Sequence, residues 1–365
     1  MAVPPPADRA DRLAALLAEE RLDALVVTDL HDVRWLTGFT GSNGAAVVGA
    51  DGTRRFLTDF RYLEQVRTQV PDPWERIDGG RDLGGAGVAA NLPREAVRVG
   101  FDDADVTVAA HRRLRDAVRD GVELVPAPGL VRRLRQVKEP AERDAIRAAC
   151  ELASTAFVTV ILEGPVVGRT ERQVALDLVH EMQRLGASDA SFPPIIAAGA
   201  HGALPHAEPR DVEIPVGALL TVDWGCVLDG YCSDCTRTVA TGPLDADARR
   251  VYDVVLDAQL QALAAVRSGA DVRAVDAVAR DVIGDAGHRE HFGHGLGHGV
   301  GLEVHEGPTL SPRGSGALRA GEIVTVEPGI YVPGRHGVRI EDLAAVTDDG
   351  PDVFTGTVTK ELVEL

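Results

Sequence analysis

Cysteine is scarce in this chain, and the few thiols do not have the spacing of a disulfide framework or a metal cluster. Four cysteines occur among 365 residues, too few for a protein held together by disulfides. Cys232 and Cys235 form a C-x-x-C pair, but no second pair follows, and residues three apart on a strand point to opposite faces. We expect small buried side chains here, not a zinc or redox site.

Positive charge is scarce as well. The chain carries 38 Lys and Arg against 56 Asp and Glu, a formal net charge of -18. This excess of negative charge repels nucleic acid and anionic membranes unless a local basic stripe offsets it, and the sequence has no such stripe. We therefore expect neither nucleic acid nor a membrane as a partner. Lysine occurs only at Lys138 and Lys360, which we interpret as compositional drift without functional weight.

Long uninterrupted apolar runs are also missing from the sequence. None approaches the roughly 20 residues that a membrane-spanning helix needs. The first 20 residues combine prolines with an amphipathic charged pattern, and they lack the apolar centre and small-residue cleavage site of an export signal. We expect a cytoplasmic protein.

The length of the chain suits two domains. In the first part, short strand patterns such as 24–27 and 45–48 are interspersed with helical patterns near 62–70 and 109–118, which predicts an α/β domain. Residues 126–129, Pro-Ala-Pro-Gly, mark a break. Beyond it, helices and strands segregate, which favours α+β with an antiparallel sheet. We predict domains at residues 1–131 and 132–365.

Two aspartates are predicted to converge on one face of a hairpin. Asp223 interrupts a strongly apolar strand pattern, and Asp229-Gly230 is a strong two-residue turn signal. Such a turn pairs Asp223 with Thr236 and puts Asp234 on the same face. Buried together, the two carboxylates repel each other unless cations lie between them. The alternative is that one of them caps a turn or pairs with Arg237.

Three further candidates follow along the chain. His298 lies in the glycine-rich stretch 291–301, which lacks the Lys-Ser/Thr of a phosphate loop. Glu327 ends an apolar strand directly before a proline. Because neighbouring side chains on a strand face oppositely, Glu341 shares the inner face with Arg339 and Asp342 faces outward. A simple ion pair between Glu341 and Arg339 is the alternative interpretation.

The order Asp, Asp, His, Glu, Glu, with gaps of 11, 64, 29 and 14 residues, resembles the ligand pattern of the metal-dependent aminopeptidase, prolidase and creatinase family. The resemblance covers residues 139–365 and includes the phrases T-V-D-W-G, S-D-C-T-R-T, G-H-G-V-G-L-E-V-H-E, T-V-E-P-G-I-Y and R-I-E-D. Residues 34–41, R-W-L-T-G-F-T-G, are similar to the smaller domain of the proline-specific members. The implied fold is α+β, with a pita-bread catalytic domain after a smaller α/β creatinase-like domain.

The resemblance also implies a set of metal ligands. By position, Asp223 matches the bidentate ligand of one metal, and Asp234 and Glu341 match the two bridging carboxylates. His298 and Glu327 match the remaining ligands of the other metal. Two divalent ions are implied, and the oxygen-rich shell with one imidazole favours Mn²⁺, with Co²⁺, Fe²⁺ or Zn²⁺ as alternatives.

The same resemblance assigns roles around the metals, which would activate a water molecule for attack on the scissile carbonyl. His206 and His305 correspond to outer donors to the developing oxyanion. Glu327 corresponds to the proton shuttle to the leaving nitrogen. His294 corresponds to a histidine that lines the substrate pocket, and Arg339 to a residue near the bridging glutamate.

The function implied is release of an N-terminal residue from a peptide with proline at the second position, as by aminopeptidase P. Xaa-Pro dipeptidase activity is the alternative within the same class. A catalytically silent binding module on the same fold would be expected to have lost a ligand, and all five are present, which also disfavours a metal-free creatine amidinohydrolase. The domain around Trp35 resembles one that reaches over a neighbouring subunit's site, which implies a homodimer.

Overall fold

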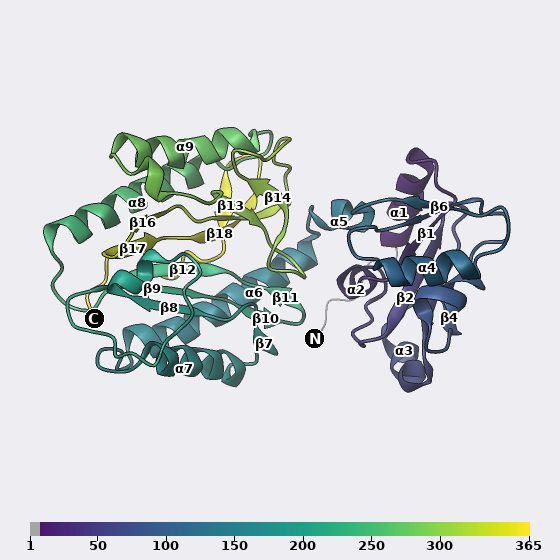
Figure 1. Cartoon of the computed structure of the whole chain (residues 1–365), viewed down its shortest axis with the longest axis horizontal. Helices are drawn as coiled ribbons and strands as arrows, with labels where there is room; N and C mark the ends of the chain where they lie inside the picture. The colour runs from purple at the N-terminus through teal and green to yellow at the C-terminus, as the bar shows by residue number, and fades with distance from the viewer. Residues whose placement is uncertain (1–7) are drawn as a thin grey trace. The chain divides into compact units, whose positions relative to one another are not determined.

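The structure, a computed structural model, describes residues 8–365 and consists of two compact units (Figure 1). One unit ends at Arg135 and the other begins at Gln136. Among residues 8–365, buried apolar side chains cluster within the first unit, around Val26 and Val47, and within the second unit on both sides of its strands. Each unit therefore has hydrophobic packing of its own.

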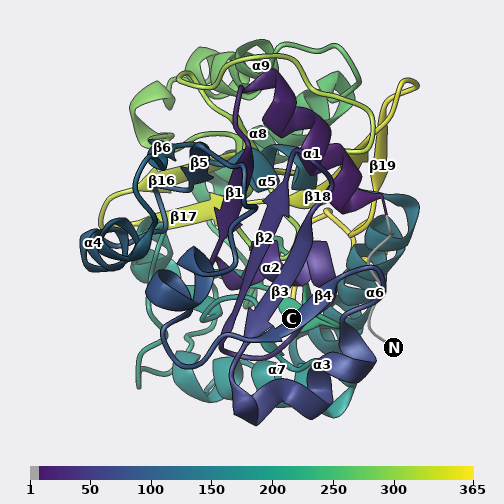
Figure 2. The same cartoon turned by 90° about the vertical axis from the view of Figure 1, so that its right-hand side faces the viewer.

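The first unit is a six-stranded mixed sheet with helices, in the strand order β4-β3-β2-β1-β5-β6 (Figure 2). Its strands are β1 (Ala24–Val27), β2 (Gly44–Gly49), β3 (Arg54–Thr58), β4 (Glu75–Asp78), β5 (Arg98–Phe101) and β6 (Glu123–Pro126). Its α-helices are α1 (Arg9–Glu19), α2 (Leu30–Thr37), α3 (Leu63–Gln69), α4 (Val108–Ala117) and α5 (Leu130–Arg135). The sheet contains both parallel and antiparallel strand pairs, and helices lie between several of its strands along the chain. The α/β prediction is therefore confirmed.

Helix α2 was not predicted from the sequence, although both of its ends carry recognisable signals. Asp29 caps its start, with the side chain accepting a hydrogen bond from the amide of Asp32 at 2.9 Å. Gly38 ends it in the left-handed conformation, with φ 78°. Trp35 on this helix is 1% exposed and lies under the Arg9 guanidinium, 4.6 Å from the ring centroid. Trp35 is therefore a core residue of the first unit.

The second unit contains four α-helices and many short strands. The helices are α6 (Pro140–Phe157), α7 (Glu171–Arg184), α8 (Ala246–Ala265) and α9 (Val272–Asp285). The strands of its first half are β7 (Asp189–Ala190), β8 (Ile195–Ala198), β9 (Leu219–Trp224), β10 (Cys226–Leu228), β11 (Tyr231–Cys232) and β12 (Cys235–Ala240). Those of its second half are β13 (Gly297–Gly299), β14 (Glu306–Leu310), β15 (Ile323–Val326), β16 (Gly329–Val332), β17 (His336–Arg339), β18 (Asp342–Val346) and β19 (Pro351–Val353).

The strands of the second unit form a layer between two pairs of helices (Figure 1). Helices α8 and α9 pack with β15 and β18 in one apolar cluster, and α6 and α7 pack with β8 and β9 in the other. The pairings between its named strands are all antiparallel. The α+β prediction with an antiparallel sheet is therefore confirmed.

The hairpin that carries the two aspartates has the predicted register. Asp229 and Gly230 have φ values of 48° and 86°, as a two-residue type I′ turn requires. Leu228 pairs with Tyr231 across the turn. Farther along the strands, Asp223 of β9 pairs with Thr236 of β12, so the turn chemistry fixes where the first carboxylate lies.

Helix α6 and the turn that follows it are long and apolar enough to cross a membrane by length and composition, contrary to the expectation from the sequence. Residues Pro140–Leu162 form this segment. Its apolar side packs in the core of the second unit, where Phe157 stacks on Trp224 with ring centroids 4.3 Å apart. The Trp224 indole also donates to the carbonyl oxygen of Ala153 at 2.8 Å. These contacts are those of a buried core helix.

Candidate active site

Three carboxylates from separate strand ends meet in the interior of the second unit. Asp223 lies on β9, Asp234 directly precedes β12, and Glu341 directly precedes β18. One oxygen from each lies within 4.8 Å of the others. The three residues are between 2% and 9% exposed, so the antiparallel layer brings together negative charges that water screens very little.

His298 and Glu327 complete this cluster. The Nδ1 atom of His298 faces the carbonyl oxygen of Gly299 at 3.1 Å and must therefore carry the proton. The other nitrogen, Nε2, points at Glu327 Oε1, 3.3 Å away, and at Asp234 Oδ2, 3.7 Å away. Burial opposes a charged ring, but the Glu327 carboxylate outweighs it and raises the pKa of His298, so a metal ion at the cluster would displace a proton from Nε2. Thr325 donates from Oγ1 to Glu327 at 3.1 Å and accepts from the amide of His298. With an ion bound, the imidazole would offer the Nε2 lone pair to the space that the carboxylates share.

The charges of the cluster are poorly balanced by the protein itself. Burial, together with the neighbouring carboxylates, raises the pKa of Asp234 and of Glu341 well above the usual range. Among the groups of residues 8–365, none donates a hydrogen bond to the buried Oδ1 atom of Asp223. Divalent cations would neutralise the repulsion and would occupy the open side of that oxygen. The donor set fits such ions, four carboxylates with one imidazole nitrogen.

Arg339 contributes the main positive charge on this side of the sheet. Its Nη2 atom donates to Asp223 Oδ2 at 2.6 Å, and its Nε atom donates to Thr236 Oγ1 at 3.1 Å. The alternative ion pair between Arg339 and Glu341 is therefore wrong. Glu341 instead accepts from Thr236 Oγ1 at 2.8 Å. Arg339 thus fixes Oδ2 of Asp223, while Oδ1 has no hydrogen-bond donor among residues 8–365.

A chain of hydrogen bonds leads from Arg339 to His294. Arg339 Nη1 donates to the Tyr331 hydroxyl at 2.8 Å, and that hydroxyl lies 3.0 Å from His294 Nε2. His294 Nδ1 faces the carbonyl oxygen of Gly295 at 2.8 Å and must be its donor. His294 Nε2 therefore accepts from Tyr331. Burial lowers the pKa of His294, which keeps the ring neutral in this arrangement.

A cavity of about 480 Å³ opens onto the cluster. All nine residues that the sequence singled out for the site line it. They are His206, Asp223, Asp234, His294, His298, His305, Glu327, Arg339 and Glu341. Phe192, Pro193 and Pro194 form part of an apolar wall. A small, partly apolar cavity with convergent polar groups suits a short peptide.

The two outer histidines reach the cavity from different loops. His305 lies beside His298, with ring centroids 4.5 Å apart. Burial and the charge of His298 lower the pKa of His305, so the ring is neutral near pH 7 and has one N–H to donate. His206 is exposed at the cavity wall.

The loop that carries His206 is held at both ends by Glu171, which the sequence analysis did not single out. The buried carboxylate of Glu171 accepts from the amide of Ala198 at 3.0 Å and from His201 Nδ1 at 2.9 Å. It also accepts from the backbone amide and the guanidinium of Arg210, each at 3.0 Å. Glu171 lies in the first turn of α7, where acidic residues are common in helices. The sequence therefore carried no specific signal for this role.

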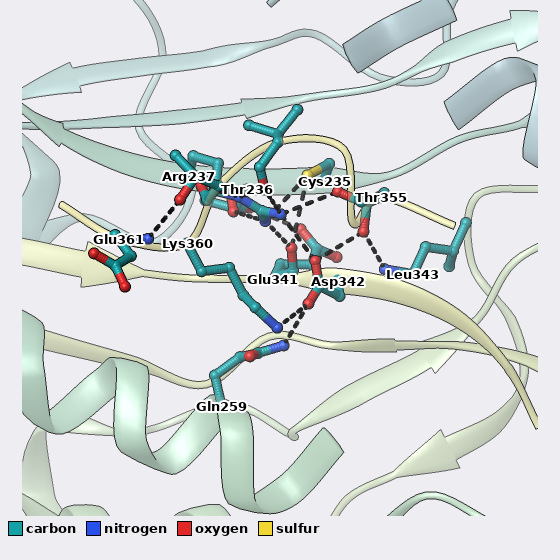
Figure 3. A network of polar contacts seen from close by, with 12 residues as sticks. Cys235, Thr236, Arg237, Gln259, Glu341, Asp342, Leu343, Thr355, Lys360 and Glu361 are labelled. Carbon is teal, nitrogen blue, oxygen red and sulfur yellow. Dashed lines mark hydrogen bonds and ion pairs between the residues drawn. The ribbon is translucent and has the colours of Figure 1, made fainter. Parts of the chain in front are cut away.

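Asp342 does not line the cavity, in line with the prediction that it faces away from Glu341, and it is fully buried in a polar network (Figure 3). Its carboxylate accepts from Arg237 Nη2 at 2.9 Å and from Lys360 Nζ at 2.6 Å. The alternative that Arg237 pairs with one of the site aspartates is therefore wrong. The apolar strand pattern around Asp342 was the signal that could have indicated a buried acid.

The cysteines behave as the sequence predicted. All four are free and buried. Burial raises the pKa of Cys226 to about 11 and that of Cys232 to about 12, so both remain protonated thiols at neutral pH.

Family models match both units. Residues 144–348, more than half of the chain, match metallopeptidase family M24, and residues 9–137 match the creatinase/prolidase N-terminal domain. The chain belongs to metallopeptidase family M24. The fold is therefore the two-domain pita-bread fold, and the family implies divalent metal ions at the carboxylate cluster. This M24 chain is a metallo-exopeptidase.

Individual relatives of this M24 enzyme cover nearly the whole chain. An Xaa-Pro dipeptidase of Pyrococcus furiosus is 39% identical over 360 residues, 96% of this chain and 98% of the relative. The solved Xaa-Pro dipeptidase from Bacillus anthracis is 35% identical with a TM-score of 0.92, covering 98% of this chain and 99% of that chain. The X-Pro aminopeptidase from Thermotoga maritima is 30% identical with a TM-score of 0.87, covering 98% and 100%.

Proposed function

We propose that this enzyme is an Xaa-Pro dipeptidase that works with two divalent ions, Mn²⁺ being the ion we favour. The observation that carries the proposal is the buried cluster of Asp223, Asp234 and Glu341, whose charges need cations. The dipeptidases of Pyrococcus furiosus and Bacillus anthracis support the substrate class. They favour the dipeptidase alternative over the aminopeptidase P activity expected first from the sequence, which we retain as the second candidate because of the Thermotoga maritima relative.

In the proposed mechanism, five side chains hold the ions. When bound, the ions would polarise the scissile carbonyl and lower the pKa of water. Asp223 offers its free Oδ1 atom, His298 offers Nε2, and Asp234, Glu327 and Glu341 offer carboxylate oxygens. The hydrogen bond from Arg339 keeps Asp223 from turning away. The ligand atoms are thus oriented before any substrate binds.

The remaining proposed residues act on the substrate. His305 and His206 donate N–H groups to the oxygen on which negative charge develops. His298 lowers the pKa of Glu327 to about 2 against the opposing effect of burial, so this carboxylate is ionised and can accept a proton for the leaving nitrogen. His294 and Arg339 line the cavity and bind the substrate.

The proposal is tested by a cleavage assay on protein stripped of metal and reloaded with Mn²⁺. The substrates are an Xaa-Pro dipeptide, an Xaa-Pro-Yaa tripeptide and an Xaa-Ala dipeptide. We expect hydrolysis of the first, little of the other two, and none before reloading. Cleavage of the tripeptide alone would instead select aminopeptidase P, and preference for Xaa-Ala would contradict proline specificity. Binding of all three without cleavage would identify a silent binding module.

Three expectations from the sequence remain predictions. The boundary between residues 131 and 132 is our proposed start of the catalytic domain. A homodimer is expected from the resemblance around residues 34–41, although Trp35 itself is buried within the first unit. A cytoplasmic location is expected as well.

A further inference from the structure

The two lysines of this arginine-rich chain occupy corresponding positions behind the proposed site. Lys138 forms an ion pair with Glu306, and Lys360 forms one with Asp342. In each pair, the acid directly follows a proposed site residue in the sequence. Glu306 follows His305, and Asp342 follows Glu341. The shared position calls for a physical explanation.

The pair of Lys138 and Glu306 lies in a nearly dry environment. Lys138 Nζ is 2.9 Å from Glu306 Oε2, and the two side chains are 2% and 5% exposed. The other oxygen of Glu306 accepts from the amide of Glu303 at 3.1 Å. Glu306 therefore ties the loop that contains His305 to the start of the second unit. Exposed ion pairs contribute little, but removing one partner of a buried pair leaves a charge without compensation.

The pair of Lys360 and Asp342 is part of a larger network (Figure 3). Lys360 Nζ and Gln259 Nε2 both donate to Asp342 Oδ2, at 2.6 Å and 3.1 Å. Arg237 Nη2 and Thr355 Oγ1 both donate to Asp342 Oδ1 at 2.9 Å. Four donors from three segments of the chain therefore fix the orientation of this carboxylate.

The network continues from Asp342 to its neighbour Glu341. Arg237 Nη1 donates to the backbone oxygen of Glu341 and, at 3.0 Å, to that of Thr236. The Glu341 amide donates to the same Thr236 oxygen at 3.0 Å, and Thr236 Oγ1 donates to Glu341 Oε2 at 2.8 Å. The backbone and the carboxylate of Glu341 are thus both held from the side away from the cavity.

We propose that Lys138 and Lys360 are positioning residues, Lys138 for His305 and Lys360 for Glu341. Neighbouring side chains of an extended segment point to opposite sides. Glu306 and Asp342 are the first residues of β14 and β18, so a lysine that fixes either acid also constrains the direction of the residue directly before the strand. The roles of His305 and Glu341 come from the proposed function, so this inference rests on it. It replaces our interpretation that the lysines carry no functional weight.

The two lysines should affect different properties of the enzyme. Glu341 is a proposed ligand, so Lys360→Met should raise the Mn²⁺ dissociation constant about 10- to 100-fold, the usual effect of a lost outer partner. His305 is an outer donor, so Lys138→Met should lower kcat at saturating Mn²⁺ about 10-fold or more while Mn²⁺ affinity stays within about threefold. Methionine keeps the apolar length of the side chain and removes only the charge.

The experiment measures Mn²⁺ binding by calorimetry and kcat for an Xaa-Pro dipeptide in each variant. Lys360→Arg retains the charge at a partly exposed position and should restore the affinity. Glu306→Gln tests the Lys138 pair again if Lys138→Met does not fold. The double variant that combines Lys138→Met with Glu306→Gln should lose no more activity than the less active of the two single variants. Arg249→Met is the control, because it removes an exposed ion pair with Asp253 on α8.

Unchanged affinity in Lys360→Met, or unchanged kcat in both Lys138→Met and Glu306→Gln, would overturn the corresponding half of the proposal. Equal losses of affinity and kcat in both lysine variants would overturn it as a whole, because that pattern indicates general destabilisation. Failure of the proposed function would give a different result from failure of this positioning proposal. The wild-type enzyme would then bind Mn²⁺ without cleaving any Xaa-Pro peptide, and the affinity shift in Lys360→Met would still support the half that concerns Glu341.

Discussion

At the scale of single residues, burial and hydrogen bonding decide what each site group can do. Asp223 has one oxygen fixed by Arg339 and one without a donor among residues 8–365. His298 has one nitrogen used by the backbone and one facing the carboxylates. Each group thus presents a single open coordination direction, which is what a preorganised metal ligand needs.

Asp234→Asn should abolish metal binding and activity while the protein remains folded. The amide keeps the size of the side chain but removes a negative charge that the other carboxylates repel. We expect activity to fall by at least about 100-fold, more than the loss of an outer partner causes. We also expect the metal-free variant to melt no lower than the metal-free wild-type enzyme. Calorimetry and bound-metal analysis check both points, and full turnover by the variant would remove Asp234 from the site.

His305→Ala should lower kcat by about 10²- to 10³-fold, the effect of losing one donor to an oxyanion. The variant should retain its metal, because the described contact of His305 is with the His298 ring, at 4.5 Å between centroids, and His305 is not one of the five proposed ligands. Bound metal and kcat are measured on the same preparation. Loss of metal would instead make His305 a ligand.

Spacing and residue type indicated the candidate ligands, because each interrupts an apolar or glycine-rich segment. The same reasoning could not find Tyr331, Thr236 or Glu171. Their roles depend on contacts with residues far away in the sequence, such as that between Thr236 and Glu341, and these contacts exist only once the strands have paired.

At the scale of elements, the turn and the strand alternation specify the hairpin that carries Asp223 and Asp234. The Asp229-Gly230 turn and the register of β9 with β12 were both predictable from the sequence. The strand partners of β13 were not. His298 owes its position to β13 pairing with β14 and β15, across a register shift after His298, and no local pattern encodes such a partner.

Gly297→Ala should disturb the site through the backbone. A Cβ atom at Gly297 would overlap the carbonyl oxygen of Thr325, which forces β13 away from its neighbour and moves His298. We expect a loss of about 1–3 kcal/mol in the free energy of unfolding and weaker metal binding. Denaturant unfolding and calorimetry measure the two effects.

Gly293→Ala is the matched control in the same glycine-rich stretch. No atom of residues 8–365 lies within 4 Å of a Cβ built there, and its backbone needs no left-handed conformation. This variant should keep wild-type stability and metal affinity. Equal effects of the two substitutions would show that the close approach at Gly297 is not what holds His298.

At the scale of the whole molecule, composition and periodicity predicted two domains of different class. They could not predict that the second unit places one strand layer between two helix pairs, because a helical period shows which face is buried but not what covers it. Helix α6 illustrates the limit. Its apolar composition suits a membrane or a protein core, and only its packing on Trp224 decides between them.

The stability of the enzyme should depend on pH mainly when metal is absent. Without ions, the pKa values of Asp234 and Glu341 are raised. Their contribution to stability is therefore present below their unfolded pKa of about 4 and is lost as pH rises through the raised values. Glu327 has the opposite effect, because its pKa is lowered to about 2. Its contribution to stability is lost only as pH falls below about 4.5, outside the range tested.

The difference in melting temperature between Mn²⁺-loaded and metal-free enzyme should therefore widen from pH 5.5 to pH 8, by at least about 4 °C. Thermal unfolding of both forms across this range, at fixed ionic strength, measures the difference. A constant or shrinking difference would mean that the carboxylates are not forced together in the folded enzyme.

The most direct test of the central claim is the number of divalent ions that the buried carboxylates take up, measured together with activity. Metal-free enzyme is titrated with Mn²⁺ while bound metal and hydrolysis of an Xaa-Pro dipeptide are followed in the same samples. We predict two ions per chain, with hydrolysis appearing only as they bind, and neither uptake nor hydrolysis in Asp234→Asn. Full hydrolysis by exhaustively chelated enzyme, or uptake unchanged in Asp234→Asn, would contradict the account.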